Sequence, residues 1–154
     1  MNEPLKRHKA LQSLSHDHHD GLILAQLAKK DSPEYSQLPK TVAGKIEYAV
    51  SYFYDELVPH FRAEENILFP FMQGKNKEID ELVHTIVEEH RRIKSLVTKI
   101  DEESNEDALD ELGHLIESHI RKEERELFPK IQDLLSEDEL TQLGNKLPKI
   151  SDEG

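Results

Sequence analysis

The sequence predicts an all-α protein that folds as an antiparallel up-and-down four-helix bundle, with a short extra helix at its C-terminal end. Four long segments carry apolar residues at three- and four-residue steps, the spacing that lines one face of a helix. Short connections separate them, and no alternating strand-type pattern competes. Charged residues make up 34% of the chain and only six residues are glycine, which fits long solvated helices better than sheets.

The first predicted helix follows an N-terminal arm, residues 1 to 12, which we expect to be solvated. Either Ser13 or Ser15 can cap this helix, which should continue to about Lys30. Pro33 and Pro39 then mark the connection to the next helix.

The second predicted helix runs from about Thr41 toward Phe71 and ends before Gly74, a residue type that commonly terminates helices. Pro59 interrupts it, because proline lacks a backbone donor and its ring crowds the carbonyl four residues earlier. We therefore expect a kink just before His60.

The remaining helices are bounded by start and stop residues. A third helix should cover residues 77 to 100, and Ser104 or Asn105 should cap a fourth that runs from residue 106 to 127 or beyond. Ser136 and Glu139 form a capping-box pattern for a short fifth helix that stops near Gly144. These boundaries predict a bundle over residues 13 to 132 and a C-terminal helix and tail over residues 133 to 154.

Composition narrows the function classes. At 154 residues the chain should form one main domain, and its net charge of −12 would repel nucleic acid and anionic membranes. There is no cysteine, so thiolate ligands and disulfides are excluded. The N-terminus has no apolar signal region and no long apolar run occurs, so a cytoplasmic location is the expectation.

One stretch occurs twice. Residues 60 to 70 return as residues 119 to 129, with seven of eleven positions identical. Each copy contains a His-x-x-x-Glu pair, His60 with Glu64 and His119 with Glu123. Residues four apart project from the same face of a helix, so each pair resembles half of a metal site.

Six polar side chains should face the core, one histidine from each long helix and two of the glutamates. They are His18, His60, Glu64, His90, His119 and Glu123. Burying two carboxylates and four imidazoles without partners would cost many kcal/mol. A cation at the centre would turn these groups into ligands; the alternative is a polar core in which each glutamate bonds a neighbouring histidine.

Three further residues are candidates for ligands or for positions just outside them. His19 competes with His18, and Glu124 could replace Glu123 if the helix is locally unwound. Glu56 lies one turn before His60 at the edge of the same face. Otherwise Glu124 and its counterpart Glu65 should be solvated. The remaining histidines should lie away from the core: His8, His16, His84 and His114.

Imidazole and carboxylate ligands without sulfur suit iron, manganese or zinc. Six ligands are too many for one tetrahedral ion, and each glutamate can bridge two ions. Two octahedral ions offer about twelve positions, of which the histidines and two bridging glutamates would fill about eight. A bridging oxide or hydroxide would take about two more, which leaves about two open for an exogenous ligand.

These residues resemble the hemerythrin family, specifically its HHE cation-binding domain, over roughly residues 11 to 130. The resemblance rests on His18, His90 and the duplicated His-x-x-x-Glu pairs. It implies a hemerythrin-like bundle that holds two non-haem iron ions, bridged by both carboxylates and by an oxo or hydroxo group. It also implies that dioxygen, nitric oxide or peroxide binds at an open iron position.

The chain departs from the oxygen-carrying members of that family in two places. Those proteins have a His-x-x-x-His pair on the third helix, whereas the positions one turn either side of His90 are Ile86 and Lys94. They also use His-x-x-x-x-Asp on the fourth helix, where this chain offers Glu123 or Glu124. One histidine ligand is therefore missing, which weighs against stable reversible oxygen carriage.

Three functions remain as hypotheses. The first is a non-catalytic di-iron protein that senses, stores or scavenges oxygen, nitric oxide or iron. The second is a di-iron oxidase or peroxidase, for which nearby tyrosines could serve. The third is a plain interaction bundle whose acidic faces meet a basic partner. The sequence leaves the oligomeric state open.

Overall fold

The structure, a computed structural model, describes residues 7–35 and 37–147. The first long helix is α1 (Gln12–Ala28), preceded by the 3-10 turn η1 (Lys9–Leu11). The second consists of α2 (Val42–Tyr52), η2 (Phe53–Leu57), α3 (Val58–Ala63), η3 (Glu64–Leu68) and α4 (Phe69–Met72), where η2 and η3 are π-helical. The third is α5 (Lys77–Glu103). The fourth joins α6 (Glu106–Lys122), the π-helical η4 (Glu123–Leu127) and α7 (Phe128–Leu134), and the short α8 (Glu137–Lys146) follows.

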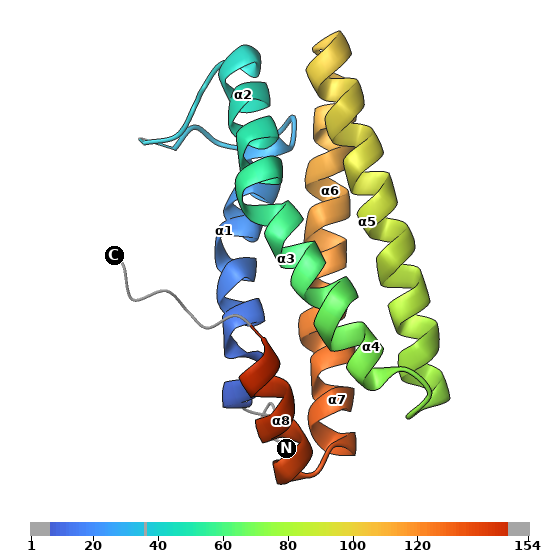
Figure 1. The fold of residues 1–154 in the computed structure, drawn as a ribbon. Coiled ribbons are helices and arrows are strands. Elements are labelled where there is room, and N and C mark those ends of the chain that lie inside the picture. The colour runs from blue at the N-terminus through green and yellow to red at the C-terminus, as the bar shows by residue number, and fades with distance from the viewer. Residues whose placement is uncertain (1–6, 36, 148–154) are drawn as a thin grey trace.

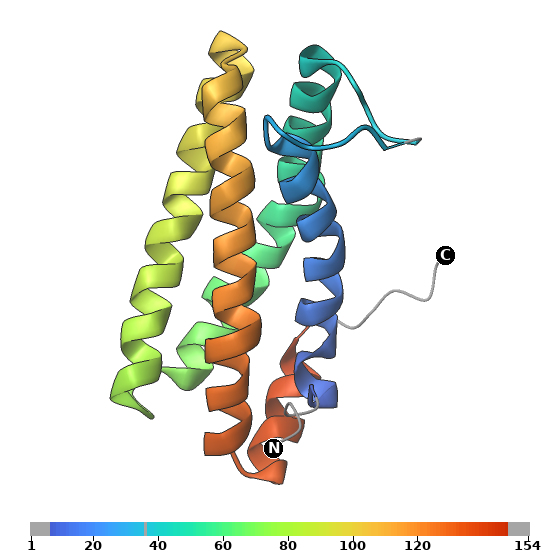
Figure 2. The same cartoon turned by 180° about the vertical axis from the view of Figure 1, so that it is seen from behind.

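The four long helices lie side by side and alternate in direction, and α8 closes one end of the bundle beside the start of α1 (Figures 1 and 2). Helix α1 packs against α2 and α6, and α5 packs against the same two helices. Helices that follow one another in the chain are therefore neighbours, and the fourth long helix returns to the first. The described residues contain no strand, so the predicted all-helical bundle is confirmed.

The first helix begins differently from the prediction. Helix α1 starts at Gln12, before either Ser13 or Ser15. No side chain caps α1 itself; His8 instead caps the preceding turn η1, where its Nδ1 accepts a hydrogen bond from the backbone N–H of Ala10. Ala10 and Leu11 are buried and join the apolar cluster that includes α8. Residues 1 to 6 of the predicted arm lie outside the described part of the chain, and the predicted domain boundaries stay predictions.

The later helix boundaries agree with the sequence patterns. Asn76, Asn105 and Ser136 each cap a helix through a side-chain oxygen, and Ser136 forms the full capping box with Glu139. Gly74 has a φ of 80° after the end of α4, the conformation in which glycine is favoured. Helix α8 continues past Gly144 to Lys146.

Each π-helical turn ends two residues before a proline: Pro59, Pro70 and Pro129. The residue before each proline donates its backbone N–H to the carbonyl five residues earlier. The wider turn relieves the crowding that a proline ring imposes on the preceding turn. The second long helix also changes direction between α2 and α3, as Pro59 predicts (Figure 1).

The core divides into two apolar clusters with a polar layer between them. One cluster lies toward α8 and includes Leu14, Ile86 and Phe128. The other lies toward the far end and includes Leu24 and Ile93. The inward-facing histidines occupy the levels between them, so the polar layer is closed off from water at both ends. None of the helices in the described ranges combines the length and apolarity needed to cross a membrane.

Candidate metal centre

The six predicted inward residues meet in one place, each of them buried. Their exposed fractions are 5% for His18, 4% for His60, 0% for Glu64, 4% for His90, 2% for His119 and 0% for Glu123. Each long helix supplies one histidine, and the π-helical turns η3 and η4 each begin with one of the glutamates. The duplicated motif thus places its two halves face to face.

The six side chains form two overlapping groups. One group consists of His18, His60, Glu64 and Glu123. Within each group, every residue contributes one nitrogen or oxygen atom, and these atoms lie within 4.8 Å of one another. The second group consists of His90, His119 and the same two glutamates. Both carboxylates are therefore shared, which is the arrangement that two neighbouring ions require.

The Nε2 atoms of the histidines point at the shared carboxylates. His90 Nε2 lies 3.2 Å from Glu64 Oε1, and His60 Nε2 lies 3.5 Å from the same oxygen. His119 Nε2 lies 3.5 Å from Glu123 Oε2. His18 Nε2 is 2.7 Å from Glu123 Oε1, although its angles are not those of a hydrogen bond.

Eight buried polar atoms at this centre have no hydrogen-bond partner among the described residues. They are the Nε2 atoms of His18, His60, His90 and His119 and both carboxylate oxygens of Glu64 and Glu123. A buried polar group without a partner costs roughly 1–3 kcal/mol, and more when it is charged. The predicted alternative, a self-satisfied polar core, would pair these atoms, whereas here their lone pairs converge as in a metal-binding site.

The other ring nitrogen of every histidine donates to an outer carboxylate. His60 Nδ1 donates to Asp17 at 2.9 Å, and His90 Nδ1 donates to Glu65 at 2.7 Å. His119 Nδ1 donates to Glu89 at 2.8 Å. His18 Nδ1 donates to Glu124 at 2.7 Å. Since ionised carboxylates only accept, these bonds put the proton of each neutral imidazole on Nδ1, so that Nε2 is the atom that can bind a cation.

These four carboxylates, Asp17, Glu65, Glu89 and Glu124, form a ring that we call the outer carboxylate ring. Each lies next in sequence to one of the inner six residues but bonds the histidine of another helix. The order of the bonds follows the chain, from first helix to second, second to third, third to fourth and fourth back to first. Every helix is thereby tied to both of its neighbours at the level of the site.

Two members of the ring are held by further contacts. Glu124 accepts hydrogen bonds from Ser15 at 2.7 Å and from Arg7 at 3.3 Å. Glu89 accepts a hydrogen bond from Lys122 at 2.5 Å. Although burial opposes ionisation, the hydrogen bonds from His18 and Ser15 lower the pKa of Glu124, and those from His119 and Lys122 lower the pKa of Glu89.

Burial and charge set the protonation of the inner residues. Burial by itself lowers the pKa of His18, but the carboxylates of Glu123 and Glu124 raise that pKa to about 9. For His90, burial and then the nearby His119 lower the pKa to about 3. Burial raises the pKa of Glu64 well above its ordinary value, and Glu123 adds to this effect. Protons therefore compete with any cation for this centre.

The structure separates the remaining candidates. His19 is exposed, so His18 is the inward residue of the first helix. Glu124 does not replace Glu123 but holds His18 from outside. Glu56 is exposed, and within the described residues it forms no ion pair with a histidine of the centre. It does line a small cavity beside these histidines. His16, His84 and His114 are exposed as expected.

Glu65 is exposed, as predicted, whereas Glu124 is only partly exposed, so the prediction of a solvated side chain does not hold for Glu124. Their side chains are 40% and 29% exposed, yet each accepts a short hydrogen bond from a buried histidine. Asp17 and Glu89 were missed as functional residues. The available signal was position, because each outer carboxylate is the direct sequence neighbour of an inner residue. The role of the six inner residues as metal ligands stays a prediction.

The fold and this cluster define the class: a helical metal-binding domain whose two overlapping ligand groups are consistent with a dinuclear site. The family model described as Hemerythrin HHE cation binding domain matches residues 7–131, and the chain belongs to this family. The resemblance drawn from the sequence is thereby confirmed. Comparisons with curated proteins and with solved structures give no match.

Proposed function

We propose that this chain holds two iron ions at the buried centre and binds a small molecule there, such as dioxygen, nitric oxide or peroxide. The observation that carries the proposal is the set of eight buried, unpartnered donor atoms in two groups that share Glu64 and Glu123. The family supports cation binding, and the choice of iron is ours.

The donor set supports this choice of metal. Four imidazole nitrogens and four carboxylate oxygens, without sulfur, suit iron, with manganese and zinc as competitors. Eight donors are fewer than the roughly twelve positions of two octahedral ions. Positions therefore remain for a bridging oxygen ligand and for an exogenous molecule.

A small cavity beside the centre supports a small ligand. Its volume is about 10 Å³, roughly that of one water molecule, and His18, His60 and His119 line it. The other walls are largely apolar and include Leu57, Ile93, Ile116 and Ile120. We call this space the inner cavity. Its size leaves room for no more than a very small molecule and excludes larger substrates, which favours sensing, storage or scavenging.

A di-iron oxidase or peroxidase is the second candidate, and one observation favours it. Tyr52 lines the inner cavity and donates a long hydrogen bond of 3.5 Å to the carbonyl of Asp17, the residue whose carboxylate holds His60. A tyrosine so close to the centre is a plausible redox partner for turnover. Repeated consumption of peroxide or oxygen with a reductant would support this enzyme, whereas a single stoichiometric oxidation supports the binding protein.

Anaerobic reconstitution with ferrous iron, followed by exposure to air, tests the proposal. The expected result is about two irons per chain and a new charge-transfer absorption band from oxygen ligands to ferric iron. His60→Ala and His119→Ala should lose iron, whereas His84→Ala, an exposed control, should keep it. A wild-type chain that stays free of metal would end the proposal.

A further inference from the structure

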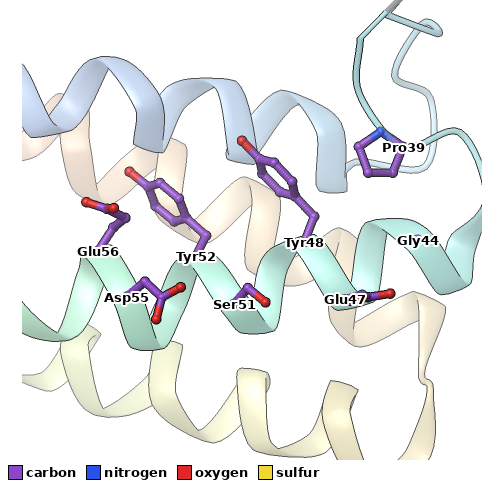
Figure 3. Close-up of a pocket in the computed structure, with 8 residues that line it drawn as sticks. All are labelled: Pro39, Gly44, Glu47, Tyr48, Ser51, Tyr52, Asp55 and Glu56. Carbon is purple, nitrogen blue, oxygen red and sulfur yellow. The ribbon is translucent and has the colours of Figure 1, made fainter. Parts of the chain in front are cut away.

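A surface groove beside the second long helix is distinct from the metal centre. It has a volume of about 470 Å³ and is lined by Pro39, Gly44, Glu47, Tyr48, Ser51, Tyr52, Asp55 and Glu56. Figure 3 shows Tyr48, Tyr52 and Glu56 projecting from one side of this helix toward α1. The two tyrosine rings are parallel, with centroids 6.4 Å apart. We call this the acidic groove.

The acidic groove adjoins the inner cavity. Tyr52 and Glu56 line both spaces, so these two side chains form the partition between them. On the inner side of the partition lie His18, His60 and His119, whose Nε2 atoms are buried and unpartnered among the described residues. A cation that passed the partition would therefore meet free ligand atoms at once.

The charge of the groove is uncompensated. Glu47, Asp55 and Glu56 are exposed, and none of them forms an ion pair within the described residues. Asp17 continues the negative charge inward, since it lines the inner cavity, is 47% exposed and bonds His60. Burial, together with Asp20, raises the pKa of both Tyr48 and Tyr52, which agrees with a negative potential along this wall. Such a cleft concentrates cations from solution.

A second cavity that reaches the centre has the opposite charge. It has a volume of about 430 Å³ and touches His90 and Phe61, whose rings stack 3.7 Å apart. Three cations and one carboxylate line it, Arg62, Arg91, Lys94 and Glu65, and Arg91 also pairs with Glu88 at 2.7 Å, so its lining is positive on balance. We call this the basic cavity. It would repel divalent cations, so charge favours the acidic groove as their way in.

We propose that divalent cations reach the metal centre through the acidic groove, with Tyr52 and Glu56 as the gate to the inner cavity. This inference rests on the proposed function, because it needs a centre that binds metal. Glu56 passes the ion inward without being one of its final ligands. That role fits its position one turn before His60, the relationship that made it a candidate ligand in the sequence.

The test is the rate at which the metal-free full-length chain takes up Co²⁺, followed by stopped-flow absorbance. The groove variant Glu47→Gln/Asp55→Asn/Glu56→Gln is compared with Glu81→Gln/Asp133→Asn/Asp138→Asn, which removes three exposed charges near the α8 end of the bundle. At low ionic strength the groove variant should load about tenfold more slowly than the control and reach the same final cobalt content. The difference should shrink at high salt, where charges are screened.

Two further variants sharpen the result. Tyr52→Ala opens the partition and should speed both cobalt uptake and its removal by a chelator. Arg62→Gln/Lys94→Gln in the basic cavity should not slow uptake. Equal rates for the groove and control variants, with full loading, would overturn the route and leave the metal centre intact. A wild-type chain that bound no Co²⁺ would overturn both the route and the proposed function.

Discussion

Asp17 Oδ2 lies 2.9 Å from His60 Nδ1, so a residue of the first long helix orients the histidine of the second. Asp17 is also the neighbour of His18, which belongs to the same group of inner residues as His60. The contact is one of four in the outer carboxylate ring. It links the packing of the helices to the direction of the Nε2 lone pairs at the centre.

Asp17→Asn should weaken metal binding by about 10- to 100-fold, because an outer carboxylate both orients its histidine and makes the imidazole more basic. Competition with a chelator of known affinity measures the change. Asp20→Asn removes the same charge from an exposed position three residues away and should have a much smaller effect. Equal losses of metal affinity in the two variants would contradict this prediction, because they would show that the affinity depends on the negative charge and not on the hydrogen bond to His60.

Glu64→Leu should abolish the stabilisation by metal without destabilising the metal-free protein. The carboxyl of Glu64 is fully buried and unpartnered within the described residues, so an apolar side chain of similar size should leave the metal-free chain equally stable or about 1–4 kcal/mol more stable. Added metal should no longer stabilise the variant, since both groups lose a shared ligand. Urea denaturation with and without metal gives both values, and a clear loss of stability in the metal-free variant would contradict this prediction.

Metal binding should weaken as the pH falls. The pKa of His18 is raised to about 9, so at pH 7 this imidazole carries a proton that must leave before Nε2 can bind a cation. Between about pH 9 and pH 6, this one proton should cost about tenfold in affinity per pH unit. Chelator competition across this range measures the slope, and an indicator dye in weak buffer detects the released protons. Binding without proton release would contradict the protonation assigned to His18.

Gly113→Ala should destabilise the bundle where α1 and α6 meet. An added Cβ would lie 2.7 Å from the backbone oxygen of Ala25, a contact that neither rigid helix can avoid without shifting. We expect a loss of about 1–3 kcal/mol in the free energy of unfolding, together with weaker metal binding, because the same interface joins His18 to Glu124. Ser118→Ala on the exposed face of α6 is the control, and equal stability of the two variants would contradict the close approach.

Much of the fold and the inner site could be predicted because both depend on helical periodicity. The repeat of residues 60 to 70 placed Glu64 and Glu123 one turn after their histidines, and the apolar neighbours of His18 and His90 indicated that these two face inward. The structure brings all six side chains together at the predicted place.

The outer carboxylate ring could not be predicted in the same way. Asp17, Glu65, Glu89 and Glu124 reach histidines on other helices, so their role depends on the rotation and spacing of neighbouring helices rather than on the pattern of one helix. The π-helical turns could not be predicted from the sequence pattern either. The prolines predicted a disturbance, but only the backbone hydrogen bonds show that two of these turns begin at Glu64 and Glu123.

The dinuclear centre is tested most directly by a crystal structure of the iron-loaded chain with anomalous scattering measured at the iron edge. Two anomalous peaks are expected, both in contact with the carboxylates of Glu64 and Glu123. One should lie beside His18 and His60, and the other beside His90 and His119. A single peak, or peaks outside these two groups, would contradict the dinuclear centre.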